Sequence, residues 1–145
     1  FWRRAALHPS LLAFDAPARE ECVPERTRSN TPQQALVRLN DPTYVEAARA
    51  LAGRILREGG ASEASRIGFV WRLVLARTPR PEEVRVLATF HQQQAEHYAA
   101  NPAAAEALLR VGDAPPAKNV PPAELAGWTA VARAVLNLHE TITRE

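Results

Sequence analysis

The sequence contains no methionine, one cysteine (Cys22) and one lysine (Lys118) among 145 residues. A single cysteine excludes an internal disulfide. Because the chain lacks methionine and begins at Phe1, we expect it to be a slice of a longer polypeptide, with any targeting signal upstream. No apolar run approaches the roughly 18 residues of a membrane-spanning helix, so no membrane span is predicted in this segment.

Positive and negative charges nearly cancel, with 18 basic and 16 acidic residues. A nucleic-acid-binding surface needs a basic stripe. A helix–turn–helix can be drawn through residues 32–58, but its outer face mixes Glu46 and Glu58 with arginines. We therefore predict no nucleic-acid partner. The sequence also has no glycine-rich phosphate loop, His-Glu-x-x-His, Gly-x-Ser-x-Gly or Cys-x-x-Cys motif, so no catalytic class is indicated.

Proline is abundant, with twelve residues, and several prolines follow residues that cap helices. Thr31-Pro32-Gln33-Gln34 has the pattern of a capping box, and Asn40-Asp41-Pro42 gives a second start signal. These patterns predict a short helix over residues 32–39 and a long amphipathic helix over residues 42–58. Gly59-Gly60 would end the second helix.

Further start signals predict three more helices: one over residues 63–76 capped by Ser62, one beginning at Pro81 and one beginning at Asn101-Pro102. Residues 1–7 are expected to be the tail of a helix begun upstream, which His8-Pro9-Ser10 breaks. A last helix should run from Pro122 to near Glu145. Apolar residues almost surround the 63–76 helix, so we expect it to be the most buried, with Trp71 inside.

The predicted fold is therefore all-α: an irregular bundle of five to six helices with a long ordered N-terminal loop. Residues 1–145 would form a single helical domain, interrupted by an exposed proline-rich loop over residues 113–122. His91 and His139 lie on predicted apolar stripes, which is typical of hydrogen-bonded core histidines. Cys22 is interpreted as a small buried apolar residue.

One polar segment stands out between Asp15 and Asn30. Its candidate binding residues are Asp15, Arg19, Glu20, Arg26, Arg28 and Asn30, with Cys22 among them. Two interpretations stay open: the group binds a polar substrate or a cation, or its charges pair with each other and with free helix ends. We expect Arg19 or Arg28 to bond Asp15, Glu20 or a helix carboxyl-end carbonyl. A soft thiol beside hard carboxylates is a poor ligand set, so we predict no metal and no cofactor.

Three groups of residues in the chain resemble one known family. The first is Phe14-Asp15-Ala16-Pro17 with Arg19-Glu20, and the second is Asn30-Thr31-Pro32 with Gln34–Leu36 and Leu39–Pro42. The third is Trp128–Arg133 with Leu136–Leu138 and Thr143–Glu145. Together they resemble the C-terminal part of the planctomycete-type PSD1 domain, domain of unknown function 1553. Ala18, Ser29, Gln33 and His139 depart from the family pattern.

The resemblance implies a large secreted or envelope-associated parent protein with upstream domains, often a cytochrome-c-like one, and so a periplasmic or extracellular location. The expected function is a non-catalytic helical module that docks to those upstream domains. The alternative is part of an enzyme, in which the polar segment contributes to a carbohydrate-directed or redox-linked site completed by the N-terminal portion of the family domain. The family provides no catalytic residues to transfer.

Overall fold

A computed structural model describes residues 7–17, 22, 24–25, 29, 31–117 and 119–143. Within these ranges the chain forms eight α-helices and no strands. They are α1 (Pro9–Ala13), α2 (Pro32–Asn40), α3 (Pro42–Glu58), α4 (Glu63–Leu75), α5 (Pro81–Ala100), α6 (Pro102–Leu109), α7 (Pro122–Leu136) and α8 (His139–Thr143). The all-α class is confirmed, and the two helices beyond the predicted six are the five-residue α1 and α8.

Local capping explains why the predicted helix starts are where the sequence placed them. The Thr31 hydroxyl accepts a hydrogen bond from the Gln34 N–H at 3.3 Å, and the Asp41 carboxylate accepts one from the Thr43 N–H at 2.9 Å. Ser62 does the same for the Ser65 N–H at 3.1 Å. Each bond satisfies a backbone donor that has no partner inside its own helix.

The sequence predicts only a helix break at His8-Pro9-Ser10, and this prediction misses the helix that begins there. Pro9 is the first residue of α1, and the His8 side chain accepts from the Ser10 N–H at 3.3 Å. The His8 carbonyl accepts from the N–H groups of Leu11 and Leu12. Proline suits the first helical position because its missing N–H would have no partner there.

The last helix is also shorter than predicted, ending at Leu136 instead of near Glu145. A longer helix would need the Leu136 carbonyl to accept from residue 140, but this carbonyl accepts from the Arg38 guanidinium. The Asn137 and Leu138 N–H groups bond three residues back, to Ala134 and Val135. The chain therefore turns after α7 and starts α8 at His139.

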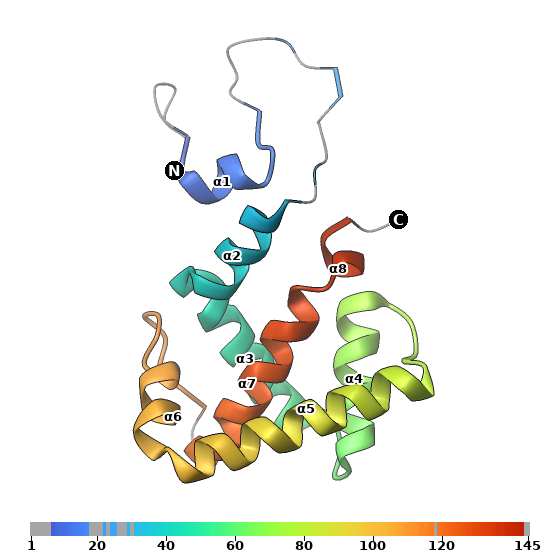
Figure 1. Cartoon of the computed structure of the whole chain (residues 1–145), viewed down its shortest axis with the longest axis vertical. Coiled ribbons are helices and arrows are strands. Elements are labelled where there is room, and N and C mark those ends of the chain that lie inside the picture. Colours follow the sequence, from blue (N-terminus) through green and yellow to red (C-terminus); the bar gives the residue numbers. More distant parts are fainter. Residues whose placement is uncertain are drawn as a thin grey trace.

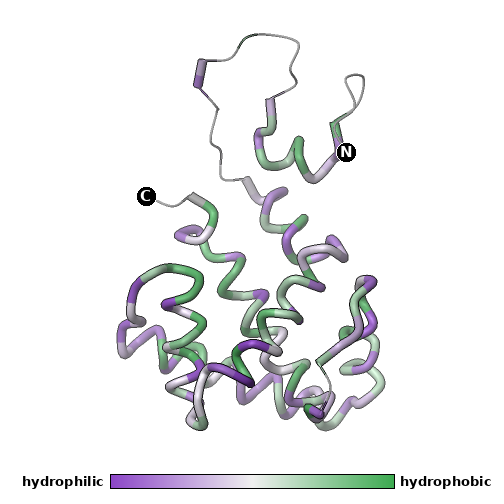
Figure 2. Tube along the Cα trace, turned by 180° about the vertical axis from the view of Figure 1, so that it is seen from behind, coloured by the Kyte–Doolittle hydropathy of each residue, from purple (hydrophilic) through white to green (hydrophobic). Residues whose placement is uncertain are grey.

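The core is built around α7, which runs through the middle of the molecule between α3 and α5 (Figure 1). Its buried residues are Leu125, Ala126, Gly127, Trp128, Thr129, Ala130, Val131, Ala132 and Val135. Hydrophobic residues predominate along this helix in Figure 2. The prediction that the 63–76 helix is the most buried is therefore wrong. Trp71 is 4% exposed, as predicted, but Leu73 on the same helix is 43% exposed.

The part of the connection between α6 and α7 that contains Asp113 and Ala114 is held against α3. The Glu46 carboxylate accepts from the N–H groups of Asp113 and Ala114, the second at 3.2 Å. Arg49, which is buried, donates to the carbonyls of Leu109 and Ala114. Two charged side chains of α3 thus replace the backbone partners that a loop lacks.

Two arginines link α2 and α7 reciprocally; we refer to Arg38 and Arg133 as the α2–α7 arginine pair. Arg38 of α2 donates to the Leu136 carbonyl at the end of α7, and Arg133 of α7 donates to the Leu39 carbonyl near the end of α2. A cation at a helix carboxyl end is favoured by the helix dipole. Burial lowers the pKa of Arg38 from its usual value.

Replacing Arg133 with Met should lower the free energy of unfolding by about 1.5–3 kcal/mol, because a charge-assisted hydrogen bond is lost and the Leu39 carbonyl loses its donor. Arg110→Met is the matched control, since Arg110 is exposed and pairs only with Glu106 of the same helix among the described contacts. That change should alter stability by about 0.3–0.5 kcal/mol. Urea unfolding followed by circular dichroism measures both, and equal losses would contradict the role of Arg133.

Candidate functional site: an apolar pocket beside Arg77

Of the six candidate residues in the polar segment, the structure describes Asp15. Its carboxylate accepts from the Ser29 N–H at 2.7 Å and from the Ser29 hydroxyl at 2.6 Å. The Ser29 hydroxyl in turn accepts from the side-chain amide of Gln34, which is buried in α2. Asp15 therefore fastens its end of the segment to the start of α2.

The other five candidates, Arg19, Glu20, Arg26, Arg28 and Asn30, lie outside the described residues, and so does the ion pair predicted for Arg19 or Arg28. Three other arginines, Arg38, Arg49 and Arg133, donate to carbonyls at or near helix carboxyl ends. Cys22 is exposed, so the prediction that it is buried is wrong. Residue type sets only a tendency to be buried, and position overrides it.

The two histidines assigned to apolar stripes differ in their surroundings. The His91 Nδ1 lies 2.6 Å from a Glu63 carboxylate oxygen, and its ring centroid lies 4.2 Å from that of Trp128. It is a largely buried, hydrogen-bonded histidine, as predicted. His139 is exposed, which contradicts its prediction. The reason is the early end of α7, which takes residue 139 out of the helical register of the core.

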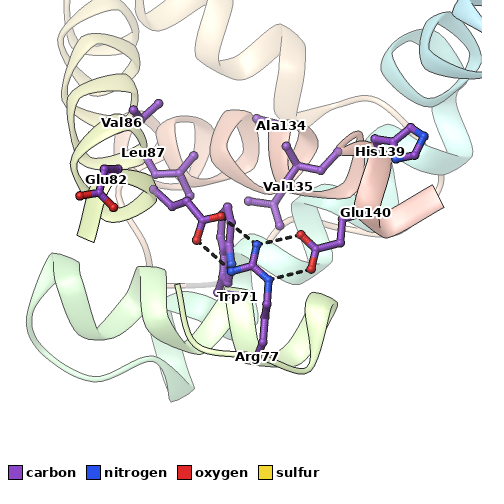
Figure 3. Close-up of a pocket in the computed structure, with 11 residues that line it drawn as sticks. Trp71, Arg77, Glu82, Val86, Leu87, Ala134, Val135, His139 and Glu140 are labelled. Carbon is purple, nitrogen blue, oxygen red and sulfur yellow. Dashed lines mark hydrogen bonds and ion pairs between the residues drawn. The ribbon is translucent and has the colours of Figure 1, made fainter. Parts of the chain in front are cut away.

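The structure contains a pocket of about 460 Å³ where α4, α5, α7 and α8 meet (Figure 3). Its apolar lining consists of Trp71, Val86, Leu87, Ala134, Val135 and Leu138. Its charged and polar lining consists of Arg77, Glu82, Glu83, His139 and Glu140. A few polar groups beside an apolar surface of this size are typical of ligand sites.

Arg77, Glu83 and Glu140 form an ion-pair group that we call the Arg77 cluster. The Arg77 Nε and Nη2 donate to the two Glu140 oxygens at 2.7 Å each. Its Nη1 and Nη2 donate to the two Glu83 oxygens at 2.9 and 2.8 Å, and Nη1 also donates to the Thr78 carbonyl at 3.2 Å. All five N–H donors of the guanidinium are thereby engaged.

The cluster holds its two carboxylates in the ionised form. Hydrogen bonds from Arg77, supported by the Arg80 backbone N–H, lower the pKa of Glu83 to about 2. Hydrogen bonds from Arg77 also lower the pKa of Glu140, and the same contacts raise the pKa of Arg77. Near neutral pH the cluster is therefore one cation between two anions.

This arrangement suits binding, because it joins an apolar surface to a fixed set of charges. The Arg77 guanidinium carbon lies 5.5 Å from the centre of the Trp71 ring, so the cluster and the apolar lining are in contact. The buried Trp71 indole N–H has no hydrogen-bond partner among the described residues. No group of three or more metal-ligating side chains was found within the described ranges. None of the helices described there is long and apolar enough to cross a membrane.

Sequence reasoning missed this site. It singled out none of the three charged residues Arg77, Glu83 and Glu140. The lining residues come from four helices separated by up to some seventy positions, from Trp71 to Glu140. The one available signal was local: Glu83 follows Arg80 at the spacing of a capping box, and the Glu83 carboxylate does accept from the Arg80 N–H at 2.6 Å.

The fold and the pocket define an all-α domain with a ligand-sized apolar cavity at one helix junction. The family model of PSD1, a protein of unknown function (DUF1553), matches residues 1–91, and the chain belongs to this family. The match ends within α5, so α7 and the Trp128–Arg133 motif lie beyond it. No curated protein and no solved structure matches the chain.

Proposed function

We propose that this chain is a non-catalytic helical module that docks another part of its parent protein in the pocket beside the Arg77 cluster. The observation that carries the proposal is the open apolar pocket, whose charged residues are already paired with each other. Charges paired in this way hold three helices in place around the apolar lining, since Arg77 follows α4, Glu83 belongs to α5 and Glu140 to α8.

The binding energy would come from apolar contact. Val86 lines the pocket and is 68% exposed, beside Leu87 on the same helix. Covering such side chains is favourable by about 25 cal/mol for each Å² of apolar surface removed from water. The lining is preformed, so docking need not order it, and less conformational entropy is lost on binding.

The occupant we propose is an upstream domain of the same polypeptide, with a cytochrome-c-like domain as the candidate that the family resemblance suggests. On the same basis we propose that the chain is the C-terminal part of a planctomycete-type PSD1 domain, in a secreted or envelope-associated parent that is periplasmic or extracellular. The alternative, an enzyme site around Asp15, stays a prediction from the sequence, because its other five residues lie outside the described part of the chain.

The test measures association between this chain and the upstream portion of the parent, produced separately. Val86→Glu should weaken association at least tenfold, about 1.4 kcal/mol, because it places an unpaired charge against the docked surface. Leu36→Glu is the matched control: Leu36 is also exposed, at 59%, but lies on α2 and does not line the pocket. Unchanged association for Val86→Glu, or a loss only for Leu36→Glu, would contradict docking at the pocket.

A further inference from the structure

We infer that the pocket binds an apolar carboxylate. In the free chain, Glu140 occupies the position on Arg77 that the carboxylate of this ligand would take. This inference rests on the proposed function, because it names the chemical group that a docked segment would present. The carboxylate belongs to an acidic side chain beside apolar residues on that docked segment, for which a free aliphatic acid serves as a small-molecule probe.

The two carboxylates on Arg77 are held differently. Glu83 lies in the first turn of the twenty-residue α5, its side chain is 25% exposed, and it accepts a further hydrogen bond from the Arg80 N–H. Glu140 lies on the five-residue α8, and its side chain is 48% exposed. Arg77 is its hydrogen-bond partner in the described part of the chain. Glu140 is therefore the carboxylate that can leave while Glu83 stays.

The edge of Arg77 that Glu140 occupies fits any carboxylate. Its Nε and Nη2 donate in parallel to two oxygens at 2.7 Å, which is the two-point geometry that guanidinium groups form with carboxylates. A ligand carboxylate in this position would leave the charge balance unchanged, with one cation between two anions. Exchange of one exposed ion pair for another costs little, because such pairs contribute only about 0–1 kcal/mol.

The apolar part of the ligand would then supply the net gain. Trp71, Leu87 and Val135 line the pocket next to the cluster, and Figure 3 shows Glu140 and Trp71 on either side of the Arg77 guanidinium. A ligand held on Arg77 by its carboxylate can therefore place an apolar chain against this lining. Glu140 offers only its own short side chain, so it competes for the cation without filling the pocket.

An apolar amine would carry the opposite charge, and the charges of the Arg77 cluster disfavour its binding. It would have to draw Glu83 or Glu140 away from Arg77 and leave that guanidinium underpaired. The third carboxylate of the lining, Glu82, already lies 3.3 Å from Arg85. The cluster is thus better suited to exchange an anion than to accept a second cation.

The test titrates the 145-residue chain with octanoate, octylammonium and octanol, following the Trp71 indole N–H resonance by nuclear magnetic resonance. Octanoate should bind most tightly of the three. Glu140→Gln should bind octanoate roughly two- to fivefold more tightly than the unmodified chain, because the internal competitor has lost its charge. Arg77→Gln should lose octanoate binding, and Val86→Glu, a change at an exposed position that is compatible with folding, should weaken it at least tenfold.

Tighter octanoate binding by Glu140→Gln is the result that a purely structural ion pair between Arg77 and Glu140 would not produce. Unchanged or weaker octanoate binding by Glu140→Gln would overturn the inference, as would tighter binding of octylammonium or indifference of octanoate binding to Val86→Glu. If octanoate fails these tests while Val86→Glu still weakens association with the upstream portion, the inference falls and the docking function stands.

Discussion

Trp128→Ala should lower the free energy of unfolding by about 3–5 kcal/mol, because it removes a large aromatic side chain from a closed site. Trp128 has no exposed surface and lies in the middle of α7. Its ring packs against His91 of α5, and the Arg66 guanidinium carbon lies 5.9 Å from the ring centre. A cavity here would loosen the contact of α7 with two neighbouring helices at once.

Leu73→Ala provides the control, since Leu73 is a large apolar residue that is 43% exposed on α4. Its loss should cost about 1–1.5 kcal/mol, since nearly half of its surface already faces solvent. Urea unfolding followed by circular dichroism compares the two. Similar losses for Trp128→Ala and Leu73→Ala would show that α7 is not the centre of the core.

Gly112→Ala should destabilise the protein by about 3 kcal/mol, through backbone strain and lost hydrogen bonds. Gly112 has a φ of +91°, a conformation that residues with a Cβ rarely adopt. An added Cβ would also lie 2.0 Å from a Glu46 carboxylate oxygen. That oxygen accepts from the N–H groups of Asp113 and Ala114, so moving it releases the loop from α3.

Gly68→Ala is the matched control for this substitution. Gly68 is buried in α4, and the nearest atom that its added Cβ would meet is an Arg72 nitrogen at 3.7 Å. Alanine is the better helix former, so this change should stabilise the protein by about 0.5–1 kcal/mol. Opposite signs for the two variants are expected in thermal unfolding. A neutral Gly112→Ala would contradict the loop geometry.

A helix boundary could be predicted from the sequence where the interactions that fix it are between residues close together in the chain. The starts of α2, α3 and α5 depend on a cap and a proline within four residues, and the sequence predicts all three. The start of α1 carries the same proline signal, but Pro9 was interpreted only as part of the break after a preceding helix. In that case the information was present, and the start of α1 was missed.

The end of α7 shows the opposite situation. Neither glycine nor proline follows Leu136, and Asn137 is a weaker local stop signal than either. The Leu136 carbonyl is taken by Arg38, almost a hundred residues earlier in the chain. The predicted helix was too long, and this error affected His139. The predicted apolar stripe included His139, but α7 ends before residue 139.

The candidate pocket could not be predicted for the same reason. Arg77, Glu83 and Val135 become neighbours only when α4, α5 and α7 pack together, and the exposed charges of a helical chain give no sign of which will meet. The polar segment attracted notice because its charges are adjacent in sequence. Of its six candidate residues, Asp15 is the one that the structure describes, and its carboxylate serves to hold Ser29.

The most direct test of docking at the pocket compares amide hydrogen exchange of this chain alone with that of the same residues in the full parent protein. We expect slower exchange in the parent across α8 and the first turns of α5, where Glu140, Val86 and Leu87 border the pocket. Unchanged exchange at these helices, with protection confined to α1 and α2, would contradict the account.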